Sequence, residues 1–104
     1  MQKDVSIYID KFYLYLKTNK KYYDNTINAY LSDIEEFTCY TNKGINITFE
    51  DISSYLSYLY NDIKISKSSI GRKLSSLRSF YNYLVKEDII NYNYFNDVSN
   101  PKKG

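Results

Sequence analysis

The sequence predicts an all-α domain, a bundle of four to five helices. In four segments apolar residues recur every three or four positions, the spacing that places them on one face of a helix. Three glycines and one proline in 104 residues are too few for a turn-rich β fold. No segment shows the apolar–polar alternation of a half-buried strand. The length fits one domain.

The first helix is expected at about residues 6–17, and the second begins at Asp24 or Asn25, either of which could cap it. Gly44 is placed to follow the end of the second helix. Their apolar stripes are Ile9, Phe12, Tyr13 and Leu16 in the first, and Ile27, Tyr30, Leu31, Ile34 and Phe37 in the second.

The third helix is expected to begin after Thr48, with Asp51 completing a capping box. The fourth begins at or near Ser66 and continues to about Val85, and a short helical turn is expected at 94–98. Their apolar stripes are Ile52, Tyr55, Leu56, Leu59 and Ile63 in the third, and Ile70, Leu74, Leu77, Tyr81, Leu84 and Val85 in the fourth.

Charge is unevenly distributed along the chain. The net charge is +2, but residues 1–63 hold six lysines and nine acids, whereas residues 64–104 hold eight basic residues and three acids. Between 64 and 84 there are five basic residues and no acid. A basic region of this kind is typical of a polyanion-binding surface, and the alternative is an ordinary solvated basic face.

The basic region coincides with the outer face of the fourth helix. On a helical wheel, the side opposite the apolar stripe carries small hydroxyls and one arginine. These outward residues are Ser68, Arg72, Ser75, Ser76 and Ser79, flanked by Lys73 and Arg78. Such a face can approach phosphate oxygens closely and can enter a DNA major groove, about 12 Å wide. Tolerated surface serines with cations that complement the helix dipole are the alternative.

The start of the second helix is similar. Lys20 and Lys21 precede it, and a helix N-terminus is a natural phosphate site. Its outward polar residues are Asn25, Thr26, Asn28 and Ser32. Asp24 does not fit a phosphate site and is interpreted as the helix cap.

Several other functions are disfavoured. The chain has no histidine and one cysteine, Cys39, so neither a zinc site nor an internal disulfide can form, and no cofactor is expected. A reducing cytoplasm fits this cysteine usage. No segment resembles a signal peptide or a membrane span. The fourteen tyrosines could stack on bases, but an A/T-rich coding sequence would also enrich Tyr, Asn, Ile and Lys together.

Two segments, NTINAYLSDIEEF and SSIGRKLSSLRSFYNYL, resemble the N-terminal core-binding domain of tyrosine recombinases of the Xer and phage-integrase type. The matching positions are Thr26, Ala29, Tyr30, Asp33 and Ile34 in the first segment, and Arg72, Leu74, Ser75, Leu77, Arg78, Phe80, Tyr83 and Leu84 in the second. Pro101-Lys102 matches the boundary with the catalytic domain, whereas Asn93-Tyr94 departs from the family's Asn-Pro turn.

The resemblance implies a SAM-like orthogonal bundle over residues 1–99 and the start of a linker at 100–104. This domain would form half of a C-shaped clamp on double-stranded DNA, using its second and fourth helices. The residues implied at the DNA or on its rim are Lys21, Thr26, Asn28, Lys67, Ser68, Ser69, Arg72, Lys73, Ser76 and Arg78. Arg78 could instead hold the fold.

The resemblance also implies that the first helix contacts other recombinase protomers in a synaptic tetramer, with Tyr8, Lys11 and Tyr15 as candidates. The family's catalytic residues belong to a C-terminal domain, so this chain is not expected to be an enzyme by itself, and a catalytic domain is expected after Gly104. The competing hypothesis is a helical protein–protein interaction module with a tyrosine-rich surface.

Overall fold

The computed structural model describes residues 3–99, with side chains from Val5 onward, and within this range the chain is helical and contains no strand. The elements are α1 (Lys3–Thr18), α2 (Asp24–Thr41), α3 (Phe49–Ser57), the π-helix η1 (Tyr58–Ile63), α4 (Lys67–Lys86) and the 3-10 helix η2 (Tyr94–Asp97). The all-α bundle predicted from the sequence is confirmed, including the short helical turn after α4.

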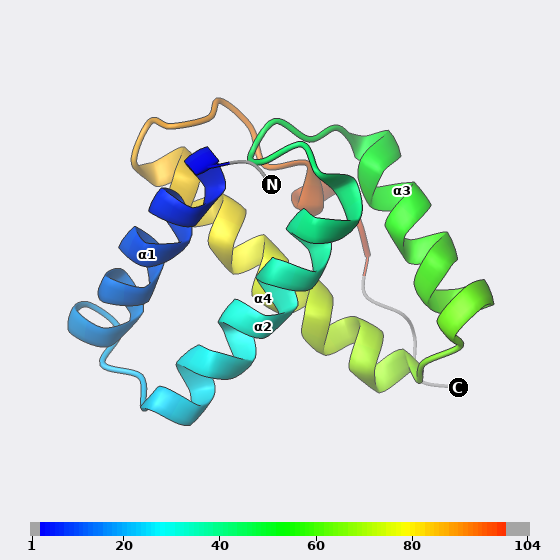
Figure 1. Cartoon of the computed structure of the whole chain (residues 1–104), viewed down its shortest axis with the longest axis horizontal. Coiled ribbons are helices and arrows are strands. Elements are labelled where there is room, and N and C mark those ends of the chain that lie inside the picture. Colours follow the sequence, from blue (N-terminus) through cyan, green and yellow to red (C-terminus); the bar gives the residue numbers. More distant parts are fainter. Residues whose placement is uncertain (1–2, 100–104) are drawn as a thin grey trace.

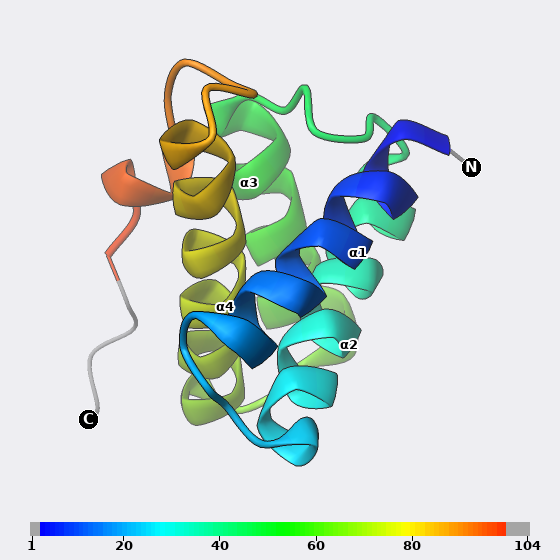
Figure 2. The ribbon, with the colours of Figure 1, turned by 90° about the vertical axis from the view of Figure 1, so that its left-hand side faces the viewer.

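The two longest helices, α2 and α4, pack against each other at the centre and cross (Figure 1). α1 flanks this pair on one side and α3 with η1 flanks it on the other, while η2 packs against α3 and α4. Viewed from the side, α1 runs obliquely across the bundle (Figure 2). α2 and α4 therefore form the centre of the bundle.

Aromatic side chains fill the core. Phe12, Phe37, Phe80 and Phe95 have no exposed surface, and Tyr81 is 1% exposed. The rings meet edge to face: centroids lie 5.3 Å apart for Phe12–Phe80 and for Phe37–Phe95. Such contacts add roughly 0.5–1.5 kcal/mol each beyond the burial of apolar area. Many of the tyrosines and phenylalanines therefore hold the helices together.

The helix ends follow the sequence in two cases. Thr48 and Asp51 form the predicted capping box of α3, with the Thr48 N–H donating to Asp51 Oδ2 at 2.8 Å. Ser66 caps α4, since its Oγ accepts from the Ser69 N–H at 3.1 Å. Both caps satisfy backbone donors that have no partner within the helix.

α2 begins at Asp24 as predicted, but two predicted helix caps are wrong. The residue before α2 is Tyr23, without a side-chain cap, and Asp24 lies inside the first turn, where it pairs with Lys17 at 3.0 Å. At the other end, Asn42 takes the left-handed conformation with φ 54°, and Gly44 lies in the loop beyond. Asparagine tolerates this conformation because its short amide can bond the local backbone.

The segment after α4 returns along the bundle and is held there by the side chain of Asn93. Asn93 is 2% exposed and caps η2, with its Oδ1 accepting from the Phe95 N–H at 2.9 Å. Its amide donates to the Arg78 carbonyl at 3.0 Å. The predicted linker at 100–104, with Pro101-Lys102, lies outside the described residues.

Among the described helices, none combines the length and apolar character needed to cross a bilayer.

Candidate nucleic-acid interface

The outer face of α4 carries three exposed residues, Ser68, Arg72 and Ser75, which we call the α4 strip. The Arg72 side chain is 59% exposed. No acid occurs between Lys64 and Lys86 in the sequence, so α4 contributes no carboxylate to this face. Gly71 adjoins the strip, and a Cβ added there would meet nothing within 4 Å. The strip therefore carries an accessible guanidinium group, and the space beside Gly71 is open.

The first half of α2 and the loop before it supply the second polar surface. Lys21, Thr26 and Asn28 are all exposed, and Lys21 has a left-handed backbone with φ 58°. The charge of Asp24 is compensated by its ion pair with Lys17, so it leaves little net negative charge at this helix end. This acid, which did not fit a phosphate site in the sequence, therefore connects α1 to α2.

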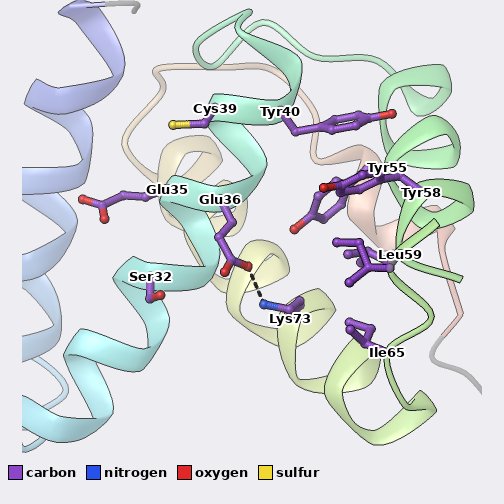
Figure 3. Close-up of a pocket in the computed structure, with 11 residues that line it drawn as sticks. Ser32, Glu35, Glu36, Cys39, Tyr40, Tyr55, Tyr58, Leu59, Ile65 and Lys73 are labelled. Carbon is purple, nitrogen blue, oxygen red and sulfur yellow. Dashed lines mark hydrogen bonds and ion pairs between the residues drawn. The ribbon is translucent and has the colours of Figure 1, made fainter.

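A buried carboxylate joins α2 to α4. Asp33 is 1% exposed, and its Oδ1 accepts from Arg72 Nη2 at 2.8 Å and from Lys73 Nζ at 3.2 Å. Its Oδ2 accepts from Ser76 Oγ at 2.8 Å. Lys73 also donates to Glu36 (Figure 3). We call these five residues the Asp33 cluster. A buried charge needs such partners, because burial without them would cost several kcal/mol.

The cluster changes the interpretation of two predicted site residues. Ser76, expected to face outward, is 2% exposed and bonded to Asp33, so that orientation is wrong. The reason is that this side of α4 faces α2. The Lys73 side chain is only 11% exposed and has two carboxylates within bonding distance, so its charge is largely compensated inside the protein.

The remaining predicted residues differ in their availability. Lys67 is exposed, and Ser69 is half-buried with its hydroxyl bonded to Ser66 at 3.1 Å. Arg78 is half-buried and donates to the Val98 carbonyl at 2.9 Å and to the Phe95 carbonyl at 3.3 Å. Arg78 thus ties the segment after α4 to the bundle, the alternative role that the sequence left open.

Sequence reasoning did not identify the Asp33 cluster. One signal was present: Asp33 directly precedes the core residue Ile34, and on a wheel it lies next to Phe37 at the edge of the apolar stripe of α2. An acid at the edge of a core-facing stripe predicts a partner on the neighbouring helix. The identity of that partner, about 40 residues away, depends on how α2 and α4 cross.

A groove of about 680 Å³ lies between α2 and the α3–η1 segment (Figure 3). Its lining includes three tyrosines, two glutamates and the exposed, free Cys39. The tyrosines are Tyr40, Tyr55 and Tyr58. Burial, followed by the charges of Glu36 and Asp33, raises the pKa of Tyr55. Its hydroxyl therefore remains neutral at physiological pH.

Comparison with known proteins places these features in a family. Residues 9–88 match the family described as phage integrase, N-terminal SAM-like domain. No solved structure matches the chain significantly.

The curated relatives are bacterial tyrosine recombinases. The chain is 37% identical over 96 residues to the tyrosine recombinase XerC of Listeria monocytogenes, and the aligned region covers 88% of this chain and 32% of that protein. It is 38% identical over 100 residues to XerC of Lacticaseibacillus casei, covering 91% of this chain and 34% of the relative. It is 43% identical over 96 residues to XerC of Leptospira interrogans, covering 88% and 31%. The chain thus spans about a third of the length of these relatives. It belongs to the family of phage-integrase N-terminal SAM-like domains.

Proposed function

We propose that this chain is a DNA-binding domain that acts in site-specific recombination, using α2 and α4 as half of a clamp on double-stranded DNA. The observation that carries the proposal is the α4 strip, an exposed, acid-free surface centred on Arg72. Family membership supports it, because the related proteins are named tyrosine recombinases.

The charges and hydroxyls on this surface suit contacts to the DNA backbone. Lys21, Lys67 and Arg72 are exposed cations that can each neutralise a phosphate. The exposed hydroxyls and amide of Thr26, Asn28, Ser68 and Ser75 can bond phosphate oxygens or base edges. Because the side chains of the strip are short around Arg72, α4 can lie close to a groove wall.

We propose that this chain does not itself cleave DNA. A tyrosine nucleophile needs an activating base or a charged partner within reach. The sequence contains no histidine to act in that role, although histidine is the commonest general base. In this proposal the domain holds the recombination site, and catalytic groups come from another domain.

Contacts with other protomers are proposed through α1. Ile7 and Leu14 are 55% and 58% exposed and lie seven residues apart, on the same face as the exposed Lys11. Tyr8 and Tyr15 are partly buried against the core, and Tyr15 packs on Tyr83 with centroids 4.9 Å apart. The aliphatic residues are therefore better placed for a partner than the tyrosines.

Cross-linking of the chain on a duplex with two binding sites, with and without Leu14→Glu, tests this contact.

The groove between α2 and α3 favours a second candidate function, a protein–protein interaction module. It combines apolar rings with acids at its edge, features suited to a peptide. The α4 strip does not line this groove, so substitutions in the strip separate the two functions.

A pair of substitutions that each introduce one negative charge tests the proposal. Ser75→Glu introduces a carboxylate into the exposed α4 strip, and Ser53→Glu makes the same change on the exposed face of α3. Arg72→Glu is less suitable, because the new carboxylate would lie beside buried Asp33. We expect Ser75→Glu to weaken binding to a short duplex about tenfold or more, measured by fluorescence anisotropy at about 50 mM salt.

Ser53→Glu is expected to bind as the wild type does, since the net charge changes equally but away from the strip. Circular dichroism establishes that both variants are folded. Equal losses in the two variants would indicate a general charge effect and contradict the proposed surface. No binding by the folded wild type would contradict the function itself and favour the interaction module.

A further inference from the structure

We infer that Asp33 is a positioning residue for DNA binding, which fixes the guanidinium group of Arg72 at the proposed DNA surface. This inference rests on the proposed function. Asp33 itself is 1% exposed and cannot touch DNA in this conformation, so any influence on binding acts through another side chain.

The carboxylate of Asp33 is held firmly. Oδ2 accepts from Ser76 Oγ at 2.8 Å, and Oδ1 accepts from Lys73 Nζ at 3.2 Å. Ser76 is 2% exposed and the Lys73 side chain 11%, so both donors are fixed by packing. These contacts orient the carboxylate so that Oδ1 also receives Arg72 Nη2 at 2.8 Å.

Arg72 bonds to a buried group although most of its side chain is exposed. Its Nη2 points to a buried acceptor, yet its side chain is 59% exposed. A guanidinium group has five N–H donors in a rigid plane. Within the described part of the chain, the bond to Asp33 is the one hydrogen bond that this group makes. Holding one donor fixes the plane and leaves the others directed outward, where they can bond a phosphate or a guanine edge.

The charges within the Asp33 cluster allow the positioning effect to be distinguished from a charge effect, because the two change DNA affinity in opposite directions. Lys73 already balances Asp33 and bridges it to Glu36, so the cluster contains two acids and two bases. Replacing Asp33 with asparagine raises the net charge of the protein by one. Charge alone therefore predicts tighter binding to a polyanion, whereas loss of positioning predicts weaker binding.

The test is a double-mutant cycle with Asp33→Asn, Arg72→Ala and the combined variant, each measured for affinity to a short duplex at fixed salt. We expect Asp33→Asn to weaken binding about three- to tenfold, the cost of ordering one freed, rotamer-rich side chain. In the Arg72→Ala background the same change should cause no further loss, because no guanidinium remains to be positioned.

Asp51→Asn is the matched control, since it makes the same chemical change and the same charge change at a capping box remote from the α4 strip. It should lower stability without weakening binding. If Asp33→Asn does not fold, Arg72→Lys replaces it, because a lysine keeps the charge but cannot both hold Asp33 and present a planar donor edge. Weaker binding by Arg72→Lys supports the inference.

Three results would overturn the inference. Asp33→Asn could bind as tightly as the wild type or tighter, its loss could be equal in both Arg72 backgrounds, or folded Arg72→Lys could bind as the wild type does. Each of these requires a wild type that binds DNA. A wild type that fails to bind overturns the proposed function, and the inference with it.

Discussion

The burial and bonding of several charged side chains in this domain depend on partners that lie far away in the sequence. Asp33 on α2 meets three donors from α4, and Arg78 on α4 meets carbonyls of Phe95 and Val98. In both cases the charged residue would lie on the surface of an isolated helix, but in the folded domain it bonds to groups of another element. The availability of a cation for DNA is therefore decided by packing as well as by sequence.

Asp51 should make the stability of the domain depend on pH. Burial by itself would raise the pKa of Asp51, but the bonds from Lys43 and Thr48 outweigh burial and lower the pKa below its usual value of 3.8. A carboxyl with a depressed pKa in the folded state stabilises the protein above that usual value, and the contribution is lost as pH falls below about 4. Asp51→Asn should therefore lower the free energy of unfolding at pH 6 by about 1 kcal/mol.

Urea unfolding at pH 6 and pH 3 measures this effect. The difference between Asp51→Asn and the wild type should shrink at pH 3, because the stabilisation from a depressed pKa fades once the pH falls below the usual value of 3.8. Glu50→Gln, which removes a neighbouring exposed carboxylate, is the control and should show no such convergence. A constant difference at both pH values would show that the ionised form of Asp51 contributes nothing.

Residue-level prediction from the sequence succeeded for most of the core and failed for its polar contacts. One apolar assignment was wrong, since Ile63 of the third stripe is 47% exposed. Ile27, Ile34 and Phe37 were assigned to the interior by spacing alone, and each has no exposed surface. Spacing along one helix reports only inside and outside. It does not report which neighbour a polar residue meets, so Ser76 was placed outward and the buried contacts of Asp33 were not predicted.

At the scale of elements, η2 is stabilised by one buried amide. Asn93 donates to the Arg78 carbonyl at 3.0 Å and to Asn82 Oδ1 at 2.8 Å, and it accepts from the Phe95 N–H at 2.9 Å. Asn93→Ala removes all three bonds and leaves the buried Phe95 N–H without this acceptor. We expect a loss of about 2 kcal/mol in the free energy of unfolding, measured with urea.

Asn91→Ala is the appropriate comparison, because Asn91 is exposed in the same segment. It should change stability by less than about 0.5 kcal/mol. Similar losses for both variants would mean that the segment contributes through its backbone and apolar contacts, and that the Asn93 bonds are dispensable.

Helix ends were predictable where the cap is a local motif. The Thr48–Asp51 box and the Ser66 cap each involve residues three apart, so the chain determines them without help from the fold. Asp24 was assigned wrongly as a cap because its ion-pair partner, Lys17, comes from the preceding helix. The π-helix at Tyr58–Ile63 has no simple sequence signal, since its buried residue Leu59 continues the stripe of α3.

For the whole molecule, the salt dependence of DNA binding should be weaker than the sequence alone suggests. Residues 64–84 hold five basic residues, which would give a slope of log K against log salt of about −4 to −5 if all met phosphates. The structure engages Lys73 and Arg78 with protein groups. With Lys21, Lys67 and Arg72 as the phosphate contacts, we expect a slope of about −3.

Anisotropy titrations between about 50 and 200 mM salt give this slope directly. The Lys67→Gln variant should reduce its magnitude by about one, because one phosphate contact is lost. A wild-type slope near zero would contradict a phosphate-based interface. A slope of −5 or steeper would require more phosphate contacts than these three, as if both Lys73 and Arg78 left their protein partners on binding.

The fold class and the family could be predicted from the sequence, because they depend on periodicity, composition and short motifs, whereas the face for DNA stays a prediction. The way in which α2 crosses α4 could not be predicted from the sequence. This crossing determines which of the ten predicted site residues are exposed and which are bonded to other groups of the protein. Ser68 and Ser76 illustrate the difference: they lie eight residues apart on α4, and one is exposed while the other is buried.

The single cysteine offers a practical consequence for studying this domain in solution. Cys39 is exposed and is the one thiol in the chain, so a fluorophore can be attached there without altering the protein further. It lies 13 residues from Thr26 on α2, about 20 Å along the helix axis. A dye at Cys39 and a second dye on the duplex would therefore act as a molecular ruler, and resonance energy transfer between them would report which end of α2 faces the DNA.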